Sequence, residues 1–165
     1  MFLWFLGISW VSVWSVFRSP ALDYRLVMLG SVLPVLELFT GSGPLHAVVG
    51  PIMALTVVML ATIKRRLVRR RWLGLVVGLF AHQVFDGCWM NSDRFWWPLS
   101  GGPVFGEPIV EADRWQVSVV LELFGLALLV WAFGRFRLDD AGVRRTFLAT
   151  GQLDRRVADG EELTC

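Results

Sequence analysis

The chain has little cysteine, little histidine and little charge for its length. Of its 165 residues, two are Cys, two are His and 18% are charged, whereas 55% are hydrophobic. Cys88 and Cys165 stand in unlike contexts and form neither a metal-binding nor a disulfide spacing. The low charge and a mean hydropathy of +0.57 exclude an ordinary soluble domain. We therefore expect a membrane protein in which each polar side chain needs an explanation.

Other familiar features are missing as well. The start, MFLWFLGISWVSVWSVF, has no basic segment before the apolar run and no small-residue cleavage pattern, so we expect a first membrane helix and not a cleaved signal. Lys64 is the single lysine beside abundant Arg, which is typical of a high-GC bacterial source. The length allows one bundle of about four to six helices and no separate soluble domain.

Apolar segments predict an all-α polytopic membrane bundle with about five transmembrane helices. Pro34 interrupts the second segment, and the composition of Gly41–Pro44 indicates a turn after it. We expect the bundle over residues 1–137 and a cytoplasmic tail over 138–165, with a short amphipathic helix that ends at Gly151. The expected spans are Phe2–Phe17, Arg25–Thr40, Leu45–Ile63, Trp72–Met90 and Arg114–Phe133.

Basic side chains are distributed very unevenly between the two sides of this bundle. All but two of the 16 Lys and Arg residues lie on the side that holds the loop 64–71, and the exceptions are Arg94 and Arg114. The positive-inside rule then places the N-terminus outside and the C-terminus inside a bacterial plasma membrane. We expect the loop 64–71 to be a topology determinant that contacts anionic lipid, and not a nucleic-acid site.

Polar side chains converge on the outer half of the predicted bundle. The depth of a residue follows from its distance along the helix from the outer end, at about 1.5 Å of rise per residue. By this estimate the outer half contains Glu37, His46, His82, Asp86 and Glu122. His82 and Asp86 are four residues apart and share one helical face. Because an ionisable group costs free energy in hydrocarbon unless it is paired, we expect these side chains to meet.

Two imidazoles with two or three carboxylates suit a divalent zinc or manganese ion. We expect Glu37, His46, His82 and Asp86 as ligands, and Glu122 as a general base or a further ligand. Such an ion polarises a phosphoryl oxygen for hydrolysis.

The substrate groups are expected on the outer side. Arg94 and Arg114 can bind an anionic lipid head group, and Trp97 lies in an aromatic cluster suited to the region where acyl chains meet head groups.

Each of these residues also has a structural interpretation. His46 alone can be a hydrogen-bonded packing residue, and His82 with Asp86 can be a polar helix-packing pair. Glu122 can bond a neighbouring backbone or carry a proton, and the Trp-rich loop can be an interface anchor. A proton or ion path is the weaker alternative, because the inner half offers no polar continuation.

Four segments carry a family resemblance: GSVLPVLEL (30–38), GPLHA (43–47), GLFAHQVFD (78–86) and FWWPLS (95–100). Together they resemble the bacterial membrane-bound metal-dependent hydrolases, the YdjM-like inner-membrane proteins. That family shows LPD-x-D at the end of a helix, then HRG-x-THS, H-x-x-x-D and an aromatic WP motif. His82 and Asp86 match H-x-x-x-D, His46 matches the His of THS, and Glu37 stands at the second Asp of LPD-x-D.

The resemblance implies a metal-dependent hydrolase of a phospholipid or polyprenyl-phosphate-type substrate at the outer leaflet. Some motif residues differ: Val35 replaces the first Asp, Ala47 replaces the Ser, and the His and Arg of HRG are absent. These differences favour the alternative, a non-catalytic membrane subunit that stabilises or regulates a larger complex with a membrane-protein partner.

Overall fold

The computed structural model describes residues 1–39, 43–101 and 115–153. Over these ranges it contains seven α-helices and three short 3-10 helices and no β-strand, which confirms the predicted all-α class. The elements in chain order are α1 (Phe2–Phe17), α2 (Tyr24–Val32), η1 (Leu33–Phe39), η2 (Pro44–His46), α3 (Val49–Ala61), α4 (Arg66–Asp86), η3 (Cys88–Met90), α5 (Ser92–Phe95), α7 (Trp115–Arg135) and α8 (Ala141–Thr150).

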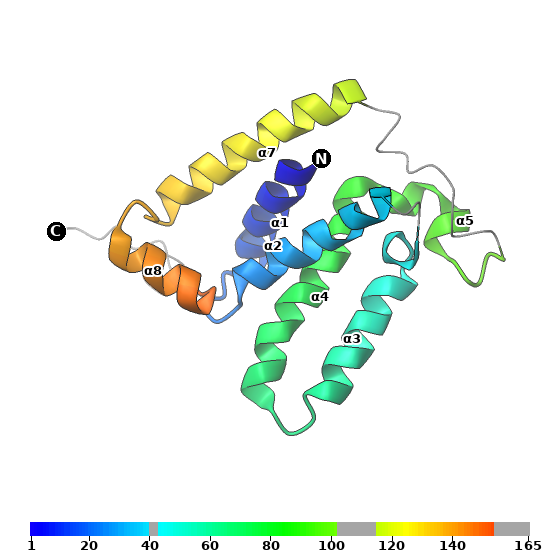
Figure 1. Ribbon diagram of the computed structural model, residues 1–165, viewed down its shortest axis with the longest axis horizontal. Helices are drawn as coiled ribbons and strands as arrows, with labels where there is room; N and C mark the ends of the chain where they lie inside the picture. The colour runs from blue at the N-terminus through cyan, green and yellow to red at the C-terminus, as the bar shows by residue number, and fades with distance from the viewer. Residues whose placement is uncertain (40–42, 102–114, 154–165) are drawn as a thin grey trace.

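The long helices run in alternating directions (Figure 1). Helix α7 runs alongside α1 in the same direction, since Glu122 bonds the first turn of α1 and Trp131 contacts Trp14. Helices α2 and α4 run parallel to each other and opposite to α1. Helix α3 is antiparallel to α4, and a short turn joins the two as a helical hairpin. We call the two ends of this bundle the Asp23 end and the His82 end.

Glycines allow the helix backbones to approach closely. A Cβ atom on Gly78 of α4 would overlap the carbonyl oxygen of Val27 in α2, and one on Gly30 would overlap the backbone of Leu75. Small residues at a helix contact have this effect in membrane bundles, where close backbone packing supplies much of the attraction. The contact between α2 and α4 therefore depends on these two glycines.

We predict that Gly78→Ala lowers the free energy of unfolding by about 1–3 kcal/mol, because the added methyl group forces the two backbones apart. The midpoint of thermal unfolding in detergent measures this effect. Gly134→Ala is the matched control, since a Cβ atom at Gly134 of α7 meets nothing within 4 Å. An equal loss in both variants would contradict the close α2–α4 contact.

Aromatic side chains form the core at the Asp23 end. Trp10 of α1 stacks on Phe136, which follows α7, and on Phe147 of α8, both at centroid distances of 5.3 Å. Helix α8 is the amphipathic tail helix that the sequence predicted: the Asp140 side chain caps its N-terminus, and Gly151 ends it with a φ of 72°. The tail helix is thus packed onto the bundle through Phe147.

A buried carboxylate ties three elements together at this end. Asp23, the N-cap of α2, is only 1% exposed and pairs with Arg25 at 3.1 Å and with Arg71 of α4 at 2.8 Å. Arg25 also donates to the Leu148 carbonyl of α8. Burial by itself raises the pKa of the Asp23 carboxyl, but the hydrogen bonds from Arg25 and Arg71 outweigh it, so the pKa lies below its usual value.

We predict that Asp23→Asn lowers the free energy of unfolding at pH 7 by about 2 kcal/mol, the scale of hydrogen bonds to a charged group. Because the folded pKa lies below the ordinary 3.8, the carboxylate stabilises the fold fully above the unfolded-state value of about 3.9 and loses this effect as the pH falls through the folded value. The difference between wild type and variant should therefore shrink in unfolding curves recorded below about pH 3.9. A difference that is constant down to the lowest pH would contradict the ion pairs.

Helix lengths differ from the five predicted spans. Among the described residues, only Gln116–Arg135 is both long and apolar enough to cross a membrane, and one such helix is weak evidence by itself. Pro34 lacks an N–H, and the second segment changes to a 3-10 helix at Leu33. The third segment opens with the 3-10 turn η2 and is α-helical only from Val49.

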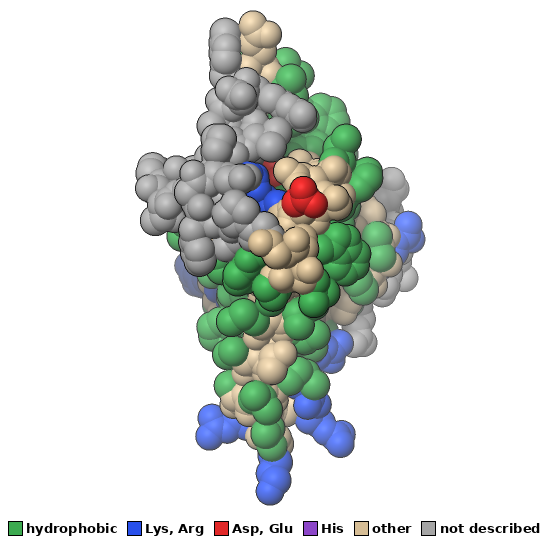
Figure 2. Space-filling model, turned by 90° about the vertical axis from the view of Figure 1, so that its right-hand side faces the viewer, with side chains coloured by type: hydrophobic (Ala, Val, Ile, Leu, Met, Phe, Trp, Pro, Cys, Tyr) green, Lys and Arg blue, Asp and Glu red, His purple; other side chains and the backbone are tan. Residues whose placement is uncertain are grey.

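The cationic segment 64–71 was predicted as a loop, and that prediction is wrong for most of it. Helix α4 begins at Arg66, so only a short turn separates it from α3. Arginine is a good helix former, and the basic run therefore winds into the first turns of α4. Figure 2 shows the blue basic side chains at the lower tip of the molecule, below a face on which green hydrophobic side chains are abundant.

Candidate metal centre

The His82 end holds a cluster of three potential ligands, His46, His82 and Asp86, which we call the His–Asp cluster. His46 ends the 3-10 turn η2, whereas His82 and Asp86 lie on the last turns of α4. One ligand atom from each residue lies within 4.8 Å of the others. His46 is 1% exposed and His82 is 0% exposed. Two segments that are distant in sequence thus meet in a buried site, as the shared depth predicted.

The orientation of His82 is set by a backbone carbonyl. Its Nδ1 atom lies 2.7 Å from the carbonyl oxygen of Ser31, which only accepts, so Nδ1 carries the proton. Ser31 lies in the last turn of α2, just before the chain changes to the 3-10 helix η1 at Leu33. A carbonyl oxygen has two lone pairs, so the one at this end of α2 can accept the His82 N–H.

Glu37 sets the orientation of His46. Its Oε2 atom lies 2.7 Å from His46 Nδ1, and the carboxylate also accepts the backbone N–H groups of Gly43 and Leu45, at 3.1 and 2.9 Å. A carboxylate oxygen accepts hydrogen bonds, so we assign the proton to Nδ1 of His46, which donates to Glu37. The sequence predicted Glu37 as a metal ligand, and the structure places it behind the imidazole of His46.

Both imidazoles present their Nε2 atoms without a partner. The two rings meet edge to face with centroids 5.2 Å apart, and each Nε2 is buried and makes no hydrogen bond. A buried polar atom left unpaired costs about 1–3 kcal/mol. Two such atoms beside a carboxylate are a poor packing network but a suitable ligand set, since a metal-binding His commonly gives its other N–H to a carboxylate or a carbonyl. The donor set therefore fits a divalent transition metal.

Two further residues contribute to the site, and sequence reasoning missed both. Gln83 Nε2 donates to the carbonyls of Leu45 at 3.2 Å and Ala47 at 2.6 Å, which fastens the His46 turn to α4. The Cys88 thiol lies 2.8 Å from Asp86 Oδ2. A polar Gln directly after His82 in an apolar helix was the available signal for the first; Cys88 gave none beyond its nearness to Asp86.

Glu122 has a different position from the one expected of a catalytic base. Its carboxylate accepts the backbone N–H groups of Phe2 and Leu3 at the start of α1, the latter at 2.7 Å, and pairs with the Met1 ammonium group at 3.4 Å. A carboxylate is favourable there because the first N–H groups of a helix lack partners. The contact with a neighbouring backbone, one of the alternatives drawn from the sequence, is the one observed.

Two of the three expected substrate-binding residues, Arg94 and Trp97, are described by the structure. Arg94 is buried on α5, and the Val48 N–H donates to the Phe95 carbonyl at 3.0 Å, which ties α5 to the segment after His46. Trp97 follows α5, is partly buried and precedes Pro98 across a cis peptide bond. Arg114 lies outside the described residues.

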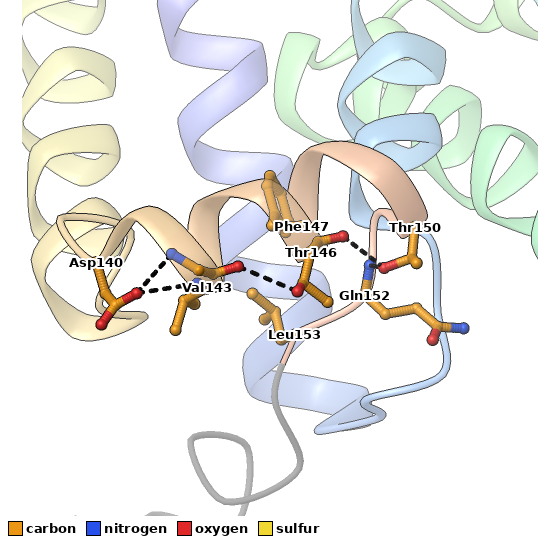
Figure 3. Close-up of a pocket in the computed structure, with 8 residues that line it drawn as sticks. Asp140, Val143, Thr146, Phe147, Thr150, Gln152 and Leu153 are labelled. Carbon is orange, nitrogen blue, oxygen red and sulfur yellow. Dashed lines mark hydrogen bonds between the residues drawn. The ribbon is translucent and has the colours of Figure 1, made fainter.

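A separate pocket lies at the Asp23 end. It has a volume of about 450 Å³ and is formed by α8 together with Gln152 and Leu153 (Figure 3). Its lining contains Asp140, Thr146 and Thr150 but no residue of the His–Asp cluster. The pocket and the cluster are therefore separate features.

Comparisons with family models, curated proteins and solved structures give no match to this chain.

We predict that Glu37→Gln weakens the binding of a divalent metal by about 10–100-fold, because loss of the carboxylate partner reduces the basicity and fixed orientation of His46. Titration of the metal-free protein with Zn²⁺ or Mn²⁺ measures the affinity. Asp139→Asn is the matched control: it removes one carboxylate that is exposed at the other end. Equal affinities of wild type and Glu37→Gln would contradict the role assigned to this carboxylate.

Proposed function

We propose that the chain is a metal-dependent hydrolase of a phospholipid or polyprenyl-phosphate-type substrate at the outer leaflet of a bacterial plasma membrane. The observation that carries this proposal is the pair of buried, unpaired Nε2 atoms beside Asp86. Each ring is held through Nδ1 by a fixed acceptor, so both lone pairs are directed without further ordering of the side chains.

His46, His82 and Asp86 would hold the ion, which we propose is zinc or manganese. When bound, such an ion polarises a phosphoryl oxygen and favours ionisation of a water molecule for attack. Glu37 stabilises the proton on His46 Nδ1, and the Ser31 carbonyl does the same for His82. Glu122 binds the first residues of α1. We therefore assign it a role in holding α1 and do not propose it as the general base.

We propose the five-span topology, with the N-terminus outside, as the setting of this site. The alternating helix directions support it, because α1 and α3 run away from the His82 end and are each followed by a helix that returns, α2 and α4. Exposed apolar side chains along two helices also support it, since a lipid environment removes their cost in water. On α3 and α7 these include Ile52, Met53, Val57, Leu60, Val120, Leu123, Phe124, Val130 and Trp131.

A lipid phosphoester is the substrate class that agrees best with this placement. The basic segment 64–71 lies at one end of the bundle, and the positive-inside rule assigns that end to the inside. The His–Asp cluster lies at the opposite end and is therefore expected on the outside. Arg94 and Trp97, on or next to α5, and Arg114 are proposed to bind the head group and the adjoining acyl chains. The resemblance to membrane-bound metal-dependent hydrolases supports the same reaction class.

One observation favours the non-catalytic alternative, a membrane subunit that stabilises a partner. Glu122, the carboxylate expected to act as base, is engaged with the first turn of α1. A site that binds metal without hydrolysis would be consistent with such a subunit. Co-purification with a membrane-protein partner, together with a metal site that lacks turnover, would distinguish it from the hydrolase.

We predict that His82→Ala lowers the rate of hydrolysis of a lipid phosphoester by at least about 100-fold. The effect is larger than that of Glu37→Gln because the variant removes a proposed metal ligand itself, whereas Glu37 only orients a ligand. Chelation of the wild type should give the same loss, and added Zn²⁺ or Mn²⁺ should restore activity only in the wild type. Phosphate release from phosphatidate and polyprenyl diphosphate in detergent micelles is the measurement. Asp93→Asn, at an exposed acid on α5, is the control with full activity. Turnover that survives both treatments would disprove the proposal.

A further inference from the structure

The turn between α3 and α4 and the first turns of α4 carry cations that make no ion pair within the described part of the bundle. We define the cationic tip as Lys64, Arg65, Arg66, Arg69 and Arg70. All but Arg69 are exposed, and within the described part of the chain none of the five makes an ion pair. Arg71 differs, because it pairs with Asp23 at 2.8 Å. The last cation of the run is therefore structural, whereas the others remain available for a partner.

Large apolar side chains alternate with these cations. Leu67 is 84% exposed, Ile63 is 60% exposed and Trp72 is 44% exposed. Exposure of these apolar side chains to water is unfavourable in free energy. A nucleic acid would pair with the cations but would leave Leu67 in solvent. The surface of an anionic membrane suits both kinds of side chain, since phosphate groups lie directly above the acyl chains.

We propose that the cationic tip binds the phosphate head groups of anionic phospholipids at the membrane surface, with Leu67 and Trp72 in contact with the acyl chains. Arg66 and Arg70 are four residues apart on α4 and therefore share one helical face toward the head groups. The snorkelling of long basic side chains lets their charges reach the phosphates while their stems cover apolar surface. This surface lies at the end opposite the His–Asp cluster, so it does not depend on the proposed hydrolase activity.

The test uses the full chain in detergent micelles and two lipids, phosphatidylglycerol and phosphatidylcholine. Native mass spectrometry measures how many molecules of each lipid the protein retains across a titration. We expect the wild type to prefer phosphatidylglycerol. Arg66→Gln/Arg70→Gln should weaken its apparent affinity by about tenfold or more, because each basic side chain near the surface contributes to the attraction. Leu67→Ser should weaken it as well, with no change in charge.

The matched control is Arg18→Gln/Arg145→Gln, which removes the same charge from two exposed positions outside the tip. It should keep the preference for phosphatidylglycerol, and all variants should keep the metal content of the wild type. Equal retention of the two lipids by the wild type would overturn the proposal, as would an equal loss in both double variants. Displacement of the lipid by inorganic phosphate, or a preference for an oligonucleotide that Leu67→Ser does not change, would assign the tip to another ligand and also overturn it.

Discussion

Two imidazole rings held by their Nδ1 atoms are the constraint on which the site depends. Glu37 holds one ring and the carbonyl of Ser31 holds the other, each at 2.7 Å. With both protons on Nδ1, each ring keeps a buried, unpaired Nε2, and one ligand atom of each ring lies within 4.8 Å of the other and of Asp86. An ion bound to these atoms, as we propose, would offset the cost of leaving them unpaired.

This geometry requires close contact between α2 and α4. Ser31 reaches His82 only because Gly30 and Gly78 let the two backbones meet, and its carbonyl lies in the last turn of α2, just before η1 begins. At the opposite end of the same two helices, Asp23 and Arg71 form the second fastening. The Asp23–Arg71 ion pair and the glycine contact thus hold α2 and α4 together. These helices carry the Ser31 carbonyl and His82, respectively.

Much of the site followed from the sequence, and the reasons are specific. The spacing of His82 and Asp86 placed them on one helical face, and the depth of His46 placed it nearby. The role of Glu37 could not be derived, because a carboxylate nine residues before a His can bind either the ion or the imidazole. The Ser31 acceptor gave no signal, because it is a backbone atom. Glu122 had the right depth, but depth does not determine which neighbour a side chain meets.

The helical class also followed from composition, whereas the helix limits did not. Apolar runs predicted five long segments, but Pro34 divides one of them and the turn η2 shortens another. Backbone hydrogen bonding determines these limits, and hydropathy does not report it. The basic run 64–71 was assigned to a loop on charge alone, although the helix propensity of arginine extends α4 back to Arg66.

The most direct test of this account is the metal content of the purified protein, measured beside a His46→Ala/His82→Ala variant. Elemental analysis combined with X-ray absorption at the metal edge reports both the amount of metal and its ligands. The account predicts near-stoichiometric zinc or manganese with imidazole nitrogen and carboxylate oxygen ligands in the wild type, and no metal in a variant that remains folded. Absence of metal from both proteins after incubation with zinc and manganese, with equal stability, would contradict it and make the His–Asp cluster a packing network.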